Sequence, residues 1–267
     1  MPELPEVETI KNELAPHVVG HSIVGLDFPW EGIVRRTSLE DFRARLIGQR
    51  ITGLGRRGKY LIFSLSSGQA LIIHLKVTGS LWFKDPEKFV RAIIRLDDGS
   101  HIYFRDPRKF GIMWLVDDAK SVGTRMGPEA LGAEFTARVL AEKLERRTAP
   151  IKALLCDQGL VAGIGNMYAD EALFLSKIHP MRAGGSLSRA EVERLYKAIR
   201  QVLAAGINDK GASTDTYFRP SGEKGSAHWQ FRVAHRRGEN CPLCGTPLKR
   251  LPVRNRGSYF CPKCQKP

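Results

Sequence analysis

The chain has 267 residues, 42% of them hydrophobic, so it is long enough to bury cores for two or three domains. Its 42 Lys and Arg against 28 Asp and Glu give a net charge of +14, which favours a polyanionic partner, with nucleic acid ahead of an anionic membrane. No apolar run approaches the roughly 18 residues of a membrane helix, so we expect no membrane span and a location inside the cell.

The first segment, M-P-E-L-P-E, predicts a helix that begins at its second proline. Pro5 suits a first helical turn and Glu6 suits the positive helix end, and apolar residues follow at helical spacing: Val7, Ile10 and Leu14. That helix does not account for Pro2 and Glu3. Methionine before a small residue is normally removed, which would expose the secondary amine of Pro2. Because an α-amino group has a pKa of about 7.7–8.0, part of it is neutral near pH 7 and can act as a nucleophile.

The region that follows, to about residue 118, is typical of strands. Y-L-I-F-S-L and A-L-I-I-H-L predict a hairpin across Ser66–Gln69, and A-I-I-R-L and H-I-Y-F predict a second across an Asp98–Gly99 turn. Repeated hairpins indicate an antiparallel sandwich or barrel. A boundary is expected near Gly127, Pro128 and Gly132.

Helices are expected beyond this boundary, at 135–144, 151–157, 166–178 and 189–205. Between two of them lies V-A-G-I-G-N at 161–166, whose glycines would expose backbone N–H groups just before a helix. Such an arrangement attracts phosphate. A plain tight turn has the same pattern. Residues 206–230 are rich in Gly, Ser, Thr and Lys and predict a long mobile loop, of the kind that often serves as a functional lid.

The last 49 residues combine cysteines with a concentration of positive charge. Residues 219–267 carry eleven Lys and Arg against two acidic residues. An odd total of five cysteines argues against a disulfide framework. Four of them form C-P-L-C and C-P-K-C pairs, whose spacing predicts one closed, structural zinc site made by Cys241, Cys244, Cys261 and Cys264. Cys156 lies in an apolar helical stretch and is expected in the core.

These motifs together resemble the bacterial formamidopyrimidine-DNA glycosylase family, which shares a superfamily with endonuclease VIII. The resemblance runs through M-P-E-L-P-E-V-E-T, R-R-G-K-Y-L at 56–61, D-P-R-K-F-G at 106–111, D-Q-G-L-V-A-G-I-G-N-M-Y-A-D-E-A-L-F at 157–174 and N-R-G-S-Y-F in the finger. Leu4 favours this branch, since endonuclease VIII typically has glycine there. The implied fold is α+β: an N-terminal helix with an antiparallel β-sandwich (1–130), a helix-two-turn-helix domain (131–232) with a lesion-capping loop at about 211–230, and a four-cysteine zinc finger (233–267).

The resemblance also implies the catalytic residues. Pro2 matches the nucleophile that attacks C1′ of the damaged nucleotide and forms an iminium. Glu3 matches the general acid/base, and Glu6 a supporting acid near the amine, with helix initiation as its alternative role. Lys59 matches a lysine beside the lesion that assists β-elimination, although a surface cation in a basic run has the same pattern. Arg256 matches the finger arginine that grips the flanking phosphates and is linked to δ-elimination.

A second set of residues is implied to bind damaged double-stranded DNA. Lys152 and Asn166 match phosphate contacts of the helical domain. Arg108 and Phe110 match side chains that fill the gap left when the damaged base leaves the stack, although Phe110 could equally pack in a core.

The chain departs from the family pattern at three places. Val77 stands where a methionine usually acts as the third gap-filling residue, and Arg91 stands where a histidine often contacts DNA. The loop reads S-T-D-T-Y-F-R-P-S-G-E-K-G in place of the common S-T-L-R-D-Y pattern. Lesion preference is therefore the property that the resemblance specifies least.

The expected function is a monomeric, cytoplasmic, bacterial DNA glycosylase and AP lyase of base excision repair, which excises 8-oxoguanine and formamidopyrimidines and cleaves the strand by β,δ-elimination. One alternative is the same chemistry on oxidised pyrimidines. A second is a non-catalytic zinc-finger protein that binds DNA, which would need none of Pro2, Glu3 and Lys59. A third is an RNA-binding zinc-ribbon protein, against which the gap-filling residues argue.

Overall fold

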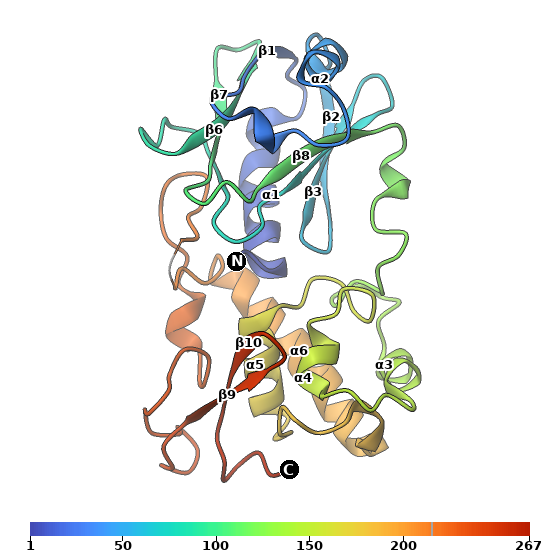
Figure 1. The fold of residues 1–267 in the computed structure, drawn as a ribbon, viewed down its shortest axis with the longest axis vertical. Coiled ribbons are helices and arrows are strands. Elements are labelled where there is room, and N and C mark those ends of the chain that lie inside the picture. Colours follow the sequence, from blue (N-terminus) through green and yellow to red (C-terminus); the bar gives the residue numbers. More distant parts are fainter. Residues whose placement is uncertain (215) are drawn as a thin grey trace. The chain divides into compact units, whose positions relative to one another are not determined.

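The computed structural model describes residues 1–214 and 216–267, so the loop expected at about 211–230 is covered except at position 215. The chain divides into two compact units. Unit 1 consists of Met1–Thr124 and Ile207–His228, and unit 2 of Arg125–Gly206 and Trp229–Pro267 (Figure 1). Most of the expected loop therefore belongs to the same unit as the N-terminus.

Unit 1 contains helix α1 (Leu4–Val18) and two four-stranded antiparallel sheets. The first sheet has the order β1 (Ile23–Asp27), β6 (Val90–Leu96), β7 (His101–Arg105), β5 (Ser80–Trp82). The second has the order β2 (Ile51–Arg57), β3 (Tyr60–Leu65), β4 (Ala70–His74), β8 (Ile112–Val116). Both predicted hairpins are confirmed as β3–β4 and β6–β7.

One hydrophobic core joins both sheets and α1. Alternate residues of β3 are buried, as expected for a strand with one face toward a core. The same buried cluster takes side chains from the other sheet and from α1, among them Phe63, Ile94, Phe104, Ile10 and Leu14. The antiparallel sandwich is thereby confirmed, with α1 against β2 and β3 (Figure 1).

Helix α2 (Leu39–Leu46) lies within the region expected to hold only strands, and that expectation is wrong there. Ser38 caps the helix, because its hydroxyl oxygen accepts the N–H of Asp41 at 3.1 Å. Phe42 and Leu46 are the buried residues of this short helix. Two 3-10 turns complete the unit, η1 (Glu31–Ile33) and η2 (Ala119–Ser121).

Unit 2 holds the four predicted helices, now α3 (Ala137–Leu144), α4 (Ile151–Leu155), α5 (Asn166–Leu175) and α6 (Arg189–Asn208), which continues into unit 1. A hairpin of β9 (Lys249–Val253) and β10 (Arg256–Phe260) forms the finger, and η3 (Gly184–Ser186) and η4 (Ala227–Gln230) are 3-10 turns. Helix α5 is the centre of the unit, since all its residues from Met167 to Phe174 are buried. Among the described residues, no helix is both long and apolar enough to span a membrane.

Candidate active site and nucleic-acid interface

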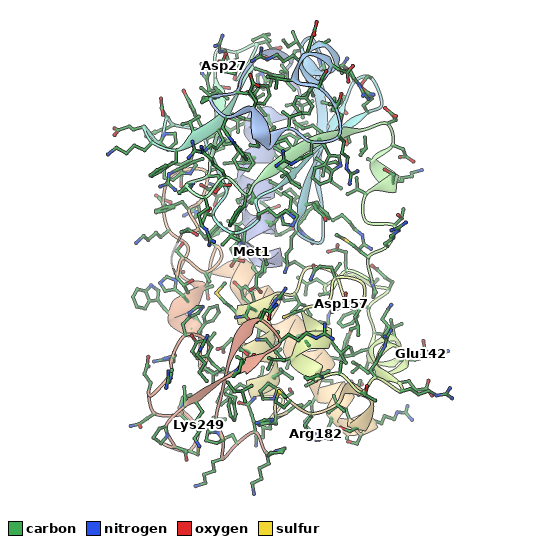
Figure 2. All side chains as sticks on the ribbon, in the orientation of Figure 1. Met1, Asp27, Glu142, Asp157, Arg182 and Lys249 are labelled. Atoms are coloured by element: carbon green, nitrogen blue, oxygen red, sulfur yellow. The ribbon has the colours of Figure 1, made fainter. Side chains whose placement is uncertain are left out.

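The N-terminus is held by the start of α1. Met1 lies at the start of the chain (Figure 2). It is exposed, whereas the next two residues, Pro2 and Glu3, are buried. Glu3 is the residue that precedes the helix, and its N–H donates to Oε2 of Glu6 at 2.7 Å. This contact is half of a capping box, and it fixes the chain directly after Pro2. Removal of Met1 would therefore leave a secondary amine at a fixed position beside a buried acid.

Glu6 also joins this helix to the start of the loop. Its Oε1 accepts the N–H of Ala212 at 2.8 Å, and the carboxylate is fully buried. The two ends of the loop are paired with each other, because Ala212 and Ser226 form an antiparallel bridge and Ala227 N–H donates to the Gly211 carbonyl at 3.0 Å. The segment thus begins and ends at one place in unit 1, where Glu6 holds its first residues.

Inside the loop, Tyr217 is buried, with 4% of its surface exposed, and its hydroxyl donates to the Lys210 carbonyl at 3.1 Å. Burial raises the pKa of Tyr217, and the nearby charges of Glu6 and Glu13 add to that rise. Arg219 forms an ion pair with Glu13 of α1 at 2.7 Å. The loop predicted to be mobile is therefore tied to unit 1 at residues 217 and 219.

Lys59 follows a tight turn between β2 and β3, where Gly58 has a positive φ of 56°. Arg56 braces that turn, since it pairs with Glu8 at 2.7 Å and donates to the Gly58 carbonyl at 2.8 Å. Lys59 is buried and not the exposed cation of the alternative interpretation. Burial, followed by the positive charges of neighbouring lysines including Lys59, lowers the pKa of His74 to about 3. This histidine is therefore neutral at physiological pH.

Asp106 organises the D-P-R-K-F-G turn. Its fully buried carboxylate accepts the backbone N–H groups of Phe110 at 2.8 Å, Gly111 at 2.7 Å and Arg108 at 3.2 Å. Gly111 is required, because a Cβ atom there would lie 2.4 Å from the ring of Phe104. Phe110 does not pack in the core, since 45% of it is exposed, and the Arg108 guanidinium lies 4.7 Å from its ring centroid.

The same aspartate fixes two further segments of unit 1. The Thr78 hydroxyl bonds to its carboxylate, which places Thr78 and its neighbour Val77 beside the turn. Arg91 donates from Nε to the Asp106 carbonyl at 2.8 Å. Asp106 therefore brings together the segments of all the predicted DNA-contacting residues of unit 1.

In unit 2 the structure brings Lys152, Asn166 and the Arg256 hairpin together. The Lys152 ammonium donates to the Asn166 carbonyl at 2.6 Å and pairs with Asp170. Burial raises the pKa of Asp170 to about 7 against the opposing charge of Lys152. The Asn166 side chain donates to the Gly257 carbonyl at 3.0 Å, next to the exposed Arg256. Lys152 is only 1% exposed in this structure, and its phosphate contact stays a prediction.

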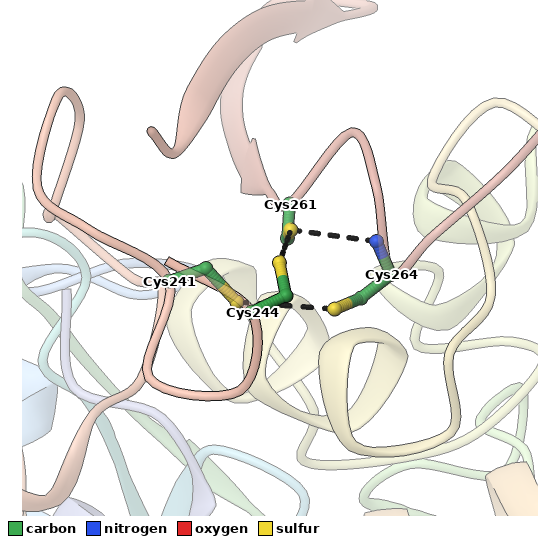
Figure 3. Close-up of side chains that lie close together, drawn as sticks. All are labelled: Cys241, Cys244, Cys261 and Cys264. Carbon is green, nitrogen blue, oxygen red and sulfur yellow. Dashed lines mark hydrogen bonds between the residues drawn. The ribbon is translucent and has the colours of Figure 1, made fainter. Parts of the chain in front are cut away.

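The four cysteines of the C-terminal pairs lie together (Figure 3). Their sulfur atoms approach at 3.5 Å for Cys244 and Cys261 and 3.9 Å for Cys241 and Cys264. Four sulfurs bound at about 2.3 Å to a tetrahedral ion lie about 3.8 Å apart, so these residues fit one zinc ion. The predicted structural zinc site is confirmed. Cys156 is buried, as expected, in unit 2 outside this cluster.

Comparisons with known proteins agree with this geometry along the whole chain. Residues 1–113 match the formamidopyrimidine-DNA glycosylase N-terminal domain, residues 126–217 its H2TH domain, and residues 238–267 the zinc finger found in FPG and IleRS. The formamidopyrimidine-DNA glycosylase of Chloroflexus aurantiacus is 43% identical over 272 residues, covering 99% of this chain and 98% of its own length. The chain belongs to the formamidopyrimidine-DNA glycosylase family.

Solved structures of this family give the same result. The MutM (Fpg) protein of Thermus thermophilus is 38% identical with a TM-score of 0.91, covering 99% of this chain and 98% of that one. A Lactococcus lactis FPG mutant in complex with DNA containing Fapy-dG is 35% identical with a TM-score of 0.92, covering all of both chains. The α+β fold with a helix-two-turn-helix domain and a zinc finger is thereby confirmed.

Two residues important to this geometry had no assigned role in the sequence. Asp106 stands before a proline within D-P-R-K-F-G, and an aspartate there often bonds the backbone of its own turn, so a local role could have been found. Asp170 gave no such signal, since it lies 18 residues from Lys152 and only the fold brings them together.

Proposed function

We propose that this chain excises oxidised purines from duplex DNA through Pro2 and then cleaves the strand. DNA glycosylase and AP lyase activities of base excision repair are characteristic of the formamidopyrimidine-DNA glycosylase family, to which it belongs. The observation that carries the proposal is Pro2 at the start of α1, directly before the buried Glu3 whose N–H is fixed by Glu6. A binding protein needs no secondary amine in this setting.

In this proposal Pro2 attacks C1′, so that an N–C1′ bond forms as the bond from C1′ to the base breaks. The base leaves with a proton, and opening of the sugar ring gives a cationic iminium between Pro2 and C1′. Glu3 moves the protons that ring opening needs. The iminium then withdraws electrons, so that loss of a C2′ proton breaks the C3′–O bond, and a second elimination breaks the C5′–O bond. Lys59 assists the first elimination and Arg256 the second.

The damaged nucleotide must leave the duplex before this chemistry, which costs a few kcal/mol. Phe110, Arg108 and Val77 fill the vacated space, and Asp106 holds their segments in place beforehand. Arg91, which bonds to the same aspartate, contacts DNA beside them. Such preorganisation lowers the entropy lost on binding.

Phosphate contacts from unit 2 are proposed for Asn166 and Arg256. Lys152 acts here as a positioning residue, because its ammonium holds the Asn166 carbonyl and Asp170. The enzyme would work in the bacterial cytoplasm, on the chromosome.

Borohydride trapping tests the proposal. The zinc-loaded protein with a processed N-terminus is incubated with a duplex containing one 8-oxoguanine, and borohydride is added during turnover. We expect a covalent protein–DNA adduct through residue 2 and, without borohydride, a strand break with phosphates at both ends. Protein that carries an N-terminal extension is the matched control and should give neither. An adduct of equal yield with the extended protein would overturn the role of Pro2, and preferential cleavage of an oxidised pyrimidine duplex would overturn the purine assignment.

A further inference from the structure

A cavity of about 260 Å³ in unit 1 lies between the end of helix α1 and the turn that joins β6 to β7. Three of the seven histidines of the chain border it, His17, His21 and His101, together with Asp98. Among the described residues, His21, Asp97 and Asp98 form the one cluster of metal-donor side chains besides the four cysteines, with a donor atom of each within 4.8 Å of the others. Imidazole nitrogens and carboxylate oxygens are donors that suit Zn²⁺ and its neighbours among the divalent cations.

Asp97 fixes the ring of His21. Its Oδ1 lies 2.9 Å from Nδ1 of His21, and its Oδ2 accepts the N–H of Ser22 at 3.0 Å. Because a carboxylate only accepts hydrogen bonds, the neutral ring carries its proton on Nδ1, which places the lone pair on Nε2. Histidines that bind metal ions are usually held in this way, by a carboxylate on the nitrogen that does not meet the ion.

The second ring nitrogen of His21 faces Asp98, because Nε2 lies 3.7 Å from Oδ2 of that carboxylate. This distance is too long for a hydrogen bond. The other oxygen, Oδ1, accepts the N–H of Ser100 at 2.9 Å and its hydroxyl at 2.7 Å, which holds the carboxylate in place. Two ligand atoms bound at about 2.1 Å to a tetrahedral ion lie about 3.4 Å apart, so the spacing of Nε2 and Oδ2 fits one shared ion to within a few tenths of an ångström.

We propose that this cavity is a second metal site, which binds one Zn²⁺ or a similar divalent cation through Nε2 of His21 and Oδ2 of Asp98. The remaining positions around the ion are open to water or to the neighbouring His17 and His101. The ion links the end of α1 to the β6–β7 turn, and it is distinct from the zinc ion of the four cysteines, which thiolates hold in unit 2. The inference does not rest on the proposed function, since it involves neither DNA nor Pro2.

The zinc content of the full chain tests this inference. The protein is first dialysed against a weak chelator, so that only the finger keeps its zinc, and then against increasing free Zn²⁺. We expect a second zinc ion to bind to the original protein and not to His21→Gln. Asp97→Asn should keep the second site with about tenfold lower affinity, because the ring of His21 loses its orientation. Asp118→Asn changes another exposed aspartate that accepts an N–H in its own turn, so it is the matched control and should bind the second ion unchanged.

Cobalt identifies the donor atoms of the second site. Co²⁺ added to the zinc-loaded protein should bind without the thiolate-to-metal charge-transfer band of a cysteine site, and Asp98→Asn should abolish this binding while the finger keeps its zinc. Without added metal, Asp98→Asn should match the original protein in unfolding and in DNA affinity. No second ion at any zinc concentration, or a second ion that persists in both His21→Gln and Asp98→Asn, would overturn the site. A protein that binds the second ion but fails to cleave 8-oxoguanine DNA would refute the proposed function and leave this inference intact.

Discussion

Each unit of this glycosylase contains a buried acid that accepts three backbone N–H groups. The two acids hold segments that differ in what else stabilises them. In unit 1, Asp106 holds the turn at 108–111. In unit 2, Glu171 accepts the N–H groups of residues 232–234 at 2.8–2.9 Å, where the chain leads toward the finger. Burial raises the pKa of Glu171 against the effect of these N–H groups.

The segments differ in what stabilises them beyond the carboxylate. The turn of Asp106 lies between β7 and β8, so the sandwich core supports it from both ends. The segment of Glu171 leads to a small cluster in which Phe174, Val233 and Leu248 pack with the cysteines. A cluster of this size cannot stabilise a finger without its metal. The exposed residues of unit 1 are therefore positioned by the protein alone, and Arg256 of unit 2 is positioned through zinc.

Zinc removal should have the largest effect, because it should unfold the finger and leave unit 1 intact. Chelation, or Cys261→Ser, should unfold the finger, because metal binding contributes on the order of 10 kcal/mol to such modules. DNA binding should be lost while unit 1 stays folded. Zinc content, circular dichroism and DNA affinity measure these effects, and Cys156→Ala is the control that should keep its zinc. Full DNA affinity in the metal-free protein would contradict this prediction.

Loss of the Asp106 charge should have the next largest effect. Asp106→Asn keeps the shape but weakens bonds from a buried carboxylate to three backbone N–H groups, so we expect the free energy of unfolding to fall by roughly 3 kcal/mol. The gap-filling residues and Arg91, which lie on the attached segments, should lose their positions, and affinity for lesion DNA should fall with zinc still bound. Urea unfolding and binding measure both, with Asp98→Asn in an exposed turn as the control. A loss below about 1 kcal/mol would show that the turn is stable without this anion.

Acid should destabilise unit 1 through His74. The pKa of this half-buried histidine is about 3 in the folded state, against 6.5 for an unperturbed side chain. The unfolded state therefore binds an extra proton between these values, so the contribution of His74 is complete above pH 6.5 and is lost as the pH falls toward 3. At about pH 5.5 the loss is about 1.4 kcal/mol. His74→Asn should lack this part of the pH dependence of unfolding, and an unchanged profile would assign the effect to other groups.

The smallest expected effect concerns Val77. Valine is shorter than the methionine usual in this family and is stiff at χ1, so part of the vacated space stays empty. A void of one or two methylenes is worth roughly 1 kcal/mol, or several-fold in the equilibrium that extracts the base. Val77→Met should modestly raise single-turnover excision of a paired lesion and change cleavage of an abasic site less.

Phe110→Ala and Val77→Ala are the comparison variants for this last experiment. We expect Phe110→Ala to be the more damaging of the two, since the exposed ring is the larger group. Equal damage by both, or strong inhibition by Val77→Met, would mean that Val77 packs in the protein and does not fill the gap in DNA.

The sequence predicted those parts of the fold that depend on local pattern. The strand-like run Y-L-I-F-S-L before the Ser66–Gln69 turn predicted β3, and the two cysteine pairs predicted the zinc site, because each signal lies within a few neighbouring residues. Helix α2 was missed, although Ser38 before two acidic residues is a typical helix start. The error came from extending a strand assignment across a region of mixed composition.

Long-range polar contacts could not be predicted in the same way. Asp106 joins three segments that are separated in the chain, and no spacing rule relates Thr78 to Asp106 or Glu6 to Ala212. Lys152 was expected to meet phosphate because it matches a phosphate-contacting position of the family, and only the fold shows that it pairs with Asp170. Motifs indicated which residues matter, whereas the carboxylates that position them became apparent only in three dimensions.

The paired ends of the loop between Ala212 and Ser226 have a consequence for engineering substrate range. Gly211 cannot gain a side chain, because its φ is +80° and a Cβ atom would lie 2.9 Å from Cγ of Glu6. Gly225 is equally restricted, since its Cβ would lie 2.2 Å from two backbone oxygens. The residues between these two glycines therefore form a cassette with fixed boundaries. An exchange with those of a relative would have to keep the Ala212 bond to Glu6 and the Arg219–Glu13 ion pair, because these contacts tie the cassette to the helix that holds the N-terminal amine.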